Sequence, residues 1–147
     1  KEQIRVAAGE ELGYDQDSIH PVGHAIECRI NAEDPDHNFR PNPGIIESFH
    51  APGGCGIRWD SHVYTGYTVP PYYDPMFGKL ICWGRDRAEA IARMEGALRE
   101  IIVDGIKTNI EFQQRLLKDE RVRRGEFSTK FIEDVLMKDE IVKPKMG

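Results

Sequence analysis

The chain has 147 residues, a formal net charge of −5, a hydrophobic fraction of 39% and a charged fraction of 31%. This length suits one globular domain with its own core, because domains commonly contain about 100 to 150 residues. The acidic balance argues against a general nucleic-acid-binding surface, which needs a basic excess, and no apolar run is long enough to span a membrane.

Cysteine and histidine form no metal-ligand pattern. The cysteines at positions 28, 55 and 82 include no Cys-x-x-Cys pair, and the histidines lack His-Glu-x-x-His spacing. We therefore expect no metal site and no disulfide framework in this chain, and a reducing, cytoplasmic setting.

The first 22 residues are typical of a short helix followed by a connector. Ile4, Ala7 and Ala8 share one helical face before Gly9, and residues 13–22 are mostly polar. Because the chain begins with a lysine, we expect residues 1–22 to lead in from a preceding part of a longer protein.

Residues 23–34, with the sequence GHAIECRINAED, alternate as a half-buried strand does. Arg29 falls on the polar side. Its guanidinium keeps its charge and offers a rigid fork of donors for planar anions such as bicarbonate, a carboxylate or a ureido oxyanion. Glu27, on the same side, is placed to hold that fork. On the alternation alone, an exposed ion pair of little consequence is the alternative.

Further strands are predicted at residues 44–50, 57–60 and 77–83. The glycine-rich stretch 51–56, APGGCG, lacks a following Gly-Lys-Ser/Thr and predicts a hairpin turn instead of a phosphate loop. Residues 64–75 combine tyrosines and prolines and predict a stiff loop. Residues 77–83 are apolar on both sides, which favours a central strand.

The second half of the sequence has helical periodicity. Capping patterns at Asp86 and Thr108 precede predicted helices, the first with helical spacing until Gly105 and the second through about Leu117, and Ser128 or Thr129 can cap a third. Residues 118–126 form a charged run that we expect to be solvated. Taken together, the elements predict an α+β fold, with helices packed on an antiparallel sheet of about four or five strands.

Three stretches, GHAIECRINAEDP, FHAPGGCGIRWDSHVYTGYTVPPYYDPMFGKLI and DGIKTN, closely resemble in this order the C-terminal domain of biotin carboxylase. The resemblance is greatest to the free-standing bacterial subunit of acetyl-CoA carboxylase, and pyruvate and acyl-CoA carboxylases carry similar motifs. It implies that residues 1–22 are an entry segment from an ATP-grasp part, 23–137 the C-terminal domain and 138–147 a tail.

The resemblance implies an ATP-grasp ligase that uses ATP, bicarbonate and Mg or Mn to carboxylate biotin on a carrier protein. This is the first half-reaction of acetyl-CoA carboxylase in fatty acid biosynthesis. The implied partners are the biotin carboxyl carrier protein, carboxyltransferase subunits and a second copy of the chain. The family's nucleotide- and metal-binding residues precede the matched region, so we expect this chain alone to bind no cofactor and to be inactive.

The resemblance also implies roles for individual residues. Arg29, supported by Glu27, matches the arginine that meets bicarbonate and stabilises the negative ureido oxygen of biotin. The predicted homodimer contacts are Cys55, Arg58 and Asp74, and the predicted neighbours of the adenine ring are Thr129 and Lys130. The family commonly has a larger apolar residue at position 55, and an aliphatic residue and His at 129 and 130.

Two other interpretations remain open. The first is a non-enzymatic dimerisation or carrier-docking module, which the missing nucleotide machinery favours. The second is another ATP-grasp ligase with a different acceptor, such as a carbamoyl-phosphate-type synthase.

Overall fold

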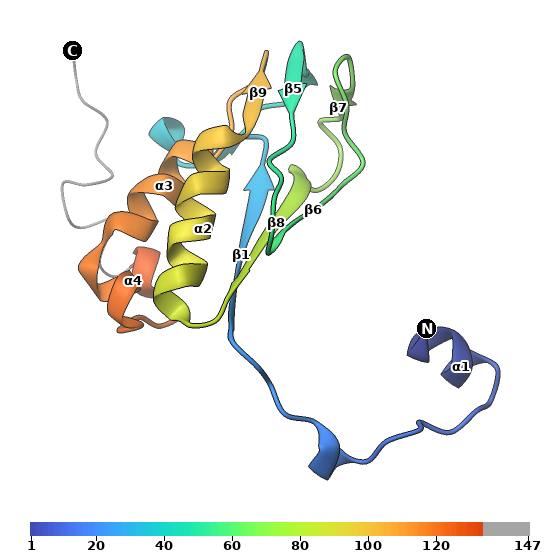
Figure 1. The fold of residues 1–147 in the computed structure, drawn as a ribbon. Coiled ribbons are helices and arrows are strands. Elements are labelled where there is room, and N and C mark those ends of the chain that lie inside the picture. The colour runs from blue at the N-terminus through green and yellow to red at the C-terminus, as the bar shows by residue number, and fades with distance from the viewer. Residues whose placement is uncertain (134–147) are drawn as a thin grey trace.

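The structure is a computed structural model that describes residues 1–133, and its centre is a three-stranded antiparallel sheet (Figure 1). The strands are, in spatial order, β1 (His24–Asn31), β8 (Met76–Gly84) and β6 (Ile57–Ser61). Smaller antiparallel pairs are formed by β2 (Glu33–Asp34) with β3 (Arg40–Pro41), β4 (Gly44–Ile45) with β7 (Thr68–Val69), and β5 (Ser48–His50) with β9 (Ile102–Asp104). The helices are α1 (Glu2–Ala7), α2 (Arg87–Glu100), α3 (Ile110–Lys118) and α4 (Glu120–Arg124), with 3-10 turns η1 (Gln16–Ser18) and η2 (Pro35–His37).

The α+β class, the antiparallel pairing and the central position of β8 are confirmed. The predicted sheet of four or five strands is divided, however, and within residues 1–133 the largest sheet has three strands. The reason lies in stretch 44–50, which changes partner halfway. The Ile46 N–H donates to the Tyr67 carbonyl at 2.9 Å, and the next N–H, that of Glu47, donates to the Asp104 carbonyl at 2.9 Å.

The hairpin predicted at residues 51–56 does not form. The turn there links β5 to β6, but β5 pairs with β9 and β6 pairs with β8. A glycine-rich turn gives the chain freedom to reverse direction, and it does not dictate that the flanking strands pair with each other.

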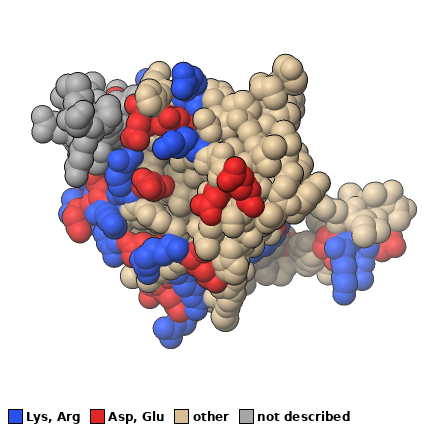
Figure 2. All heavy atoms as spheres, turned by 90° about the horizontal axis from the view of Figure 1, so that it is seen from above, with Lys and Arg blue, Asp and Glu red and all other residues tan. Residues whose placement is uncertain are grey.

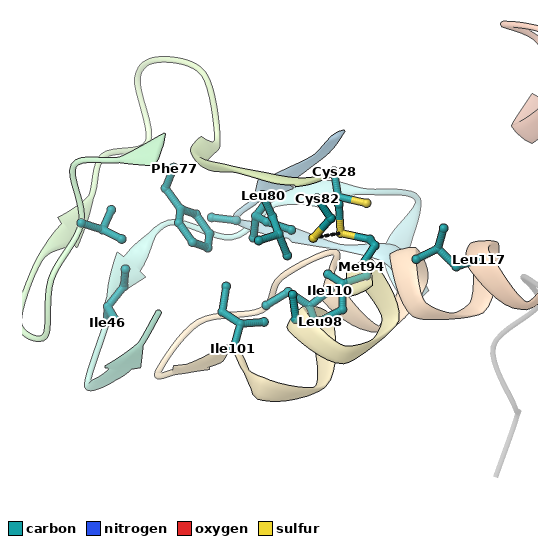
Figure 3. Close-up of a cluster of buried hydrophobic side chains, with 14 of the residues drawn as sticks. Cys28, Ile46, Phe77, Leu80, Cys82, Met94, Leu98, Ile101, Ile110 and Leu117 are labelled. Atoms are coloured by element: carbon teal, nitrogen blue, oxygen red, sulfur yellow. Dashed lines mark hydrogen bonds between the residues drawn. The ribbon is translucent and has the colours of Figure 1, made fainter. Parts of the chain in front are cut away.

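The core lies between the sheet and α2 (Figure 3). The Asp86 side chain caps α2 by accepting from the Glu89 N–H at 2.8 Å, as the capping pattern predicts. The apolar stripe of this helix then covers the inner face of β8, where Leu80 and Cys82 are fully buried beside Met94. Burying a large apolar side chain contributes about 1.5–3 kcal/mol, so this contact contributes substantially to the stability of the fold.

A β-bulge sits at the end of β1. Ile30 is opposite Gly78 but Asn31 is opposite Met76, so Phe77 is an extra residue in β8. Its ring points into the core, where it is 2% exposed (Figure 3). Gly78 is needed at this point because a Cβ atom there would lie 2.1 Å from the Trp59 ring. A bulge of this kind re-aims neighbouring side chains.

The helices after residue 105 differ in detail from the prediction. Helix α3 begins at Ile110, and its N-cap residue is Asn109, whose side chain makes no capping bond. The charged run 118–126 is not simply solvated, because it contains α4, capped by Asp119 and ended by Gly125 with a φ of 77°. The third predicted helix begins near Phe131, and its remainder lies outside the described residues.

Residues 1–22 extend away from the sheet and helices (Figure 1) and none of them is buried. Seen from above, charged side chains gather on the side of the helices and near the middle of this face, and the side away from the helices is largely uncharged (Figure 2). No helix within residues 1–133 is both long enough and apolar enough to cross a membrane.

Candidate functional site

The outward face of the three-stranded sheet carries the polar side chains of the candidate site. The antiparallel register places Arg29, Lys79 and Asp60 in one cross-strand row. The adjacent row contains Glu27, Ile81 and Arg58. Since side chains of a strand alternate between faces, the opposite residues of the same strands, including Ile30 and Leu80, belong to the core.

Arg29 lies on this face with its guanidinium accessible and held from two sides. Its Nη2 is 3.5 Å from the Asp74 carboxylate, and its Nε donates to the Met76 sulfur at 3.0 Å. The side chain remains 57% exposed, so it is not sealed inside the fold. Within the described residues Nη1 has no partner, which leaves donors of the fork available to an anion.

The carboxylate that reaches Arg29 is Asp74, not the predicted Glu27. Asp74 comes from the tyrosine- and proline-rich loop, and its side chain also accepts from the Met76 N–H at 2.8 Å. This bond ties the loop to the start of β8. Asp74, which stays a predicted dimer contact, thus also lies beside the Arg29 guanidinium.

Asn109 holds the backbone that carries Arg29. This residue is 5% exposed, and its side chain donates to the Arg29 carbonyl at 3.1 Å and accepts from the Asn31 N–H at 3.0 Å. Its own N–H donates to the Asn31 carbonyl at 3.2 Å. The Asn109 amide is thus used to fix the edge of β1, which explains why it does not cap α3.

Asn109 and Met76 were not singled out from the sequence as site residues. Both lie in the stretches that carry the resemblance, DGIKTN and YYDPMFGKLI. Only their position within these two motifs could have identified Asn109 and Met76 from the sequence, because no chemical property distinguished their side chains from those of their neighbours.

Arg58 and Asp60 form a two-point ion pair on β6. The Arg58 Nε and Nη2 donate to the two carboxylate oxygens at 2.9 and 2.6 Å. This hydrogen bonding lowers the pKa of Asp60 and raises that of Arg58. Cys55 is exposed in the turn just before β6, so these two predicted contact residues, Cys55 and Arg58, share one region.

A hollow of about 330 Å³ lies along the same face, lined by residues that include Asp60, His62, Met76 and Lys79. It therefore shares Met76 with the contacts of Arg29 and shares Lys79 with its cross-strand row. Lys79 and the Asp60 carboxylate both line the hollow, so its walls carry charges of both signs, and Arg29 reaches it only through its contact with Met76.

Thr129 and Lys130 are both exposed and lie after α4, away from the Arg29 row in the sequence. Thr129 lines a mostly apolar pocket of about 370 Å³ between β1, α3 and α4, whose walls also include Glu27 and Cys28. The structure thus brings the segment of Thr129 to the edge of the strand that carries Arg29.

The two buried cysteines, Cys28 and Cys82, have thiols of low reactivity. Burial, followed by the charges of Cys82 and Glu27, raises the pKa of Cys28 to about 12, and burial raises that of Cys82 to about 11. Neither forms a reactive thiolate near neutral pH. Residues 1–133 also contain no cluster of three or more His, Cys, Asp or Glu side chains placed to hold a metal ion.

Comparison with known families matches residues 27–134 to the model described as "Biotin carboxylase C-terminal domain". The chain belongs to this family. Biotin carboxylase from Nostoc sp. (strain PCC 7120) is 56% identical over 91% of this chain and 30% of its own length. A pyruvate carboxylase subunit from Methanothermobacter thermautotrophicus is 55% identical over 91% of this chain and 27% of its own length.

Solved structures agree with this assignment. The biotin carboxylase domain dimer of Hydrogenobacter thermophilus 2-oxoglutarate carboxylase, in complex with MgADP, ADP and bicarbonate, superposes with a TM-score of 0.90. It is 42% identical, and the match covers 97% of this chain and 31% of that one. The chain therefore spans less than a third of the length of these relatives.

Proposed function

We propose that this chain is the C-terminal part of an ATP-dependent biotin carboxylase, in which Arg29 binds bicarbonate and stabilises the oxyanion of carrier-bound biotin. The observation that carries the proposal is the guanidinium of Arg29, fixed by Asp74 and Met76 on a backbone held by Asn109 yet still open to solvent. A preorganised cation of this kind stabilises developing negative charge without having to reorganise during the reaction.

The residues that this chain contains also indicate which steps of the reaction it can support and which belong to the preceding part of the protein. None of residues 1–22 is buried, which supports their assignment as the entry from an ATP-grasp part. The proposed boundary between 23–137 as the C-terminal domain and 138–147 as a tail lies outside the described residues. The residues that hold the ATP phosphates and Mg or Mn, and the catalytic base, belong to the preceding part, while Thr129 and Lys130 of this chain lie beside the adenine ring. The 147-residue chain alone is then inactive, because one anion-binding arginine cannot position a phosphoryl group for transfer.

The outward sheet face also supports the proposed homodimer. Arg58 lies there with Trp83, which is 40% exposed, and a partly buried Ile81, and the exposed Cys55 lies in the turn just before β6. Mixed apolar and arginine surface is typical of the centres of interfaces. The biotin carboxyl carrier protein and the carboxyltransferase subunits complete the proposed set of partners, and the proposed setting is the cytoplasm.

For the final acyl acceptor we propose acetyl-CoA, with pyruvate or another acyl-CoA as the alternative. The Nostoc relative is named biotin carboxylase and the Methanothermobacter relative belongs to a pyruvate carboxylase. Reconstitution of the complete protein with each type of carboxyltransferase would decide between them: malonyl-CoA formation supports the proposal and oxaloacetate formation supports the alternative.

The experiment that tests the proposed reaction is ADP release by the complete encoded protein, measured with and without bicarbonate and biotin. Arg29→Ala is expected to lower kcat roughly 10²- to 10³-fold, and Arg29→Lys to recover only part of it, because an ammonium lacks the planar fork. Arg85→Ala is the matched control, since Arg85 is also an exposed arginine paired to a carboxylate, that of Glu89.

Three outcomes would contradict the proposal. Turnover that does not depend on biotin would favour a different ATP-grasp ligase. Equal losses in the Arg29 and Arg85 variants would remove the special role of Arg29. Biotin-dependent ADP release by residues 1–147 alone would disprove the expected inactivity of this part.

A further inference from the structure

Arg87, the first residue of α2, connects three parts of the chain that are far apart in the sequence. Its Nε donates to the Arg123 carbonyl at 3.1 Å and its Nη2 to the Val122 carbonyl at 2.5 Å. Its Nη1 lies 3.1 Å from Nε2 of His24, at the start of β1. A guanidinium only donates hydrogen bonds, so this nitrogen of His24 acts as the acceptor.

Two of these bonds meet carbonyls in the last turn of α4. The last carbonyls of a helix carry partial negative charge, so a cation bound there is favourable. The Val122 carbonyl accepts from the Gly125 N–H at 3.1 Å as well as from Arg87. Helix α4 has only five residues, and so short a helix is not stable without outside contacts. Arg87 therefore ties the last turn of α4, which Gly125 ends, to the start of α2.

The chain that leaves α4 is the segment of the proposed nucleotide neighbours. Gly125 reverses the direction of the backbone, and the Arg87 guanidinium then lies 5.8 Å from the centre of the Phe127 ring. Arg87 and Thr129 line the same 370 Å³ pocket, together with His24 and Glu27 of β1. One side chain thus contacts the start of β1, the end of α4 and the Phe127 ring.

We propose that Arg87 is a positioning residue that holds residues 127–130 against β1, so that Thr129 and Lys130 keep their place beside the nucleotide. This inference rests on the proposed function. A purely structural role would instead make Arg87 support the whole fold without a selective effect on ATP.

The test compares Arg87→Ala and Arg87→Lys with Arg85→Ala in the complete encoded protein. Arg85, two residues earlier, is 83% exposed on its side chain and pairs with Glu89 of the same helix region. We expect the KM for ATP to rise roughly tenfold or more in Arg87→Ala, in line with the loss of charge-assisted hydrogen bonds. The KM for bicarbonate should stay within about twofold. Arg87→Lys should show a smaller rise in the KM for ATP, because the ammonium keeps the positive charge. It should not restore the wild-type KM, because one ammonium cannot replace three directed contacts.

Hydrogen exchange of the same proteins without nucleotide gives a readout independent of activity. Exchange at amides 125–130 should be faster in Arg87→Ala and unchanged in Arg85→Ala, with β8 and α2 still protected. Faster exchange throughout the domain would show that Arg87 only supports the fold and would overturn the inference. If Arg87→Ala does not fold, the KM for ATP and the hydrogen exchange are measured on Arg87→Lys instead.

Failure of the inference and failure of the proposed function give different results. Biotin-dependent turnover with an unchanged KM for ATP in both Arg87 variants would refute the positioning role and leave the proposed function standing. Absence of biotin-dependent turnover in the wild-type protein would refute the proposed function, and with it the role of Arg87 toward the nucleotide.

Discussion

On the inner face of β8, Leu80 and Cys82 are fully buried beneath α2, whereas on its outer face Lys79 and Ile81 are partly exposed beside Arg29 and Glu27. The same strands thus supply both faces, and neighbouring residues in the sequence have different physical roles. Inner side chains are held by close packing, so changes in their volume affect folding. Outer side chains are held by a few ion pairs, so changes there affect binding more than folding.

The comparison is tested most strongly by substituting two neighbours on β8. Leu80→Ala opens a cavity in the core and is expected to lower the free energy of unfolding by about 2–5 kcal/mol. Lys79→Ala, one residue away on the outer face, should change it by no more than about 0.5 kcal/mol. Urea denaturation of the chain measures both. Similar losses in the two variants would show that the faces are not distinct.

Alkaline pH should lower the free energy of unfolding through Cys28, a buried residue of the inner face. The raised pKa of Cys28, about 12, means that the unfolded chain releases this thiol proton near pH 9 while the folded chain keeps it. The unfolded state then binds fewer protons, so the free energy of unfolding falls as the pH rises from about 9 to about 12, by an amount on the order of a few kcal/mol. Below about pH 9 both states keep the proton and the effect vanishes.

Chemical denaturation across this pH range would measure the effect. The slope against pH should be shallower in Cys28→Ala and unchanged in Cys55→Ala, because the Cys55 thiol is already exposed. A Cys28→Ala variant with the wild-type slope would mean that other groups cause the alkaline loss.

Charge reversal at Arg58 should act on the outer face without unfolding the chain. If this face forms the homodimer contact, Arg58→Glu is expected to raise the dimer dissociation constant at least tenfold, or about 1.4 kcal/mol. Sedimentation of the complete protein measures it, with Arg85→Glu as control. An unchanged dimer would remove Arg58 from the interface.

The smallest effect is expected from the Arg58 and Asp60 pair at acid pH. Hydrogen bonding from Arg58 lowers the Asp60 pKa below its ordinary value of 3.8. The pair therefore contributes stability above that value and loses it as the pH falls through the lower folded-state pKa. Exposed pairs contribute little and are screened by salt. Thermal unfolding at low salt should show a slightly shallower acid decline in Asp60→Asn, and identical declines would mean that the pair contributes nothing.

The comparison of the two faces also shows which parts of the fold could be predicted from the sequence. Alternation in β1 correctly assigned Cys28 and Ile30 to the core and Arg29 to the outside, because the period of two is a local property of a strand. Capping at Asp86 located α2 for the same reason. The partner change at Ile46 and Glu47 was not predictable, since it depends on carbonyls at Tyr67 and Asp104.

For the site, residue type alone identified Arg29 as a fixed cation with a fork of donors, and the motif order identified the family. The sequence did not reveal that Asp74 and Met76 would hold the guanidinium, that Asn109 would hold its backbone, or that Arg87 would tie the segment of Thr129 to β1. Local patterns determine which way a side chain faces. Contacts between residues tens of positions apart exist only after the chain has folded, so the tertiary structure alone decided which groups surround the arginine.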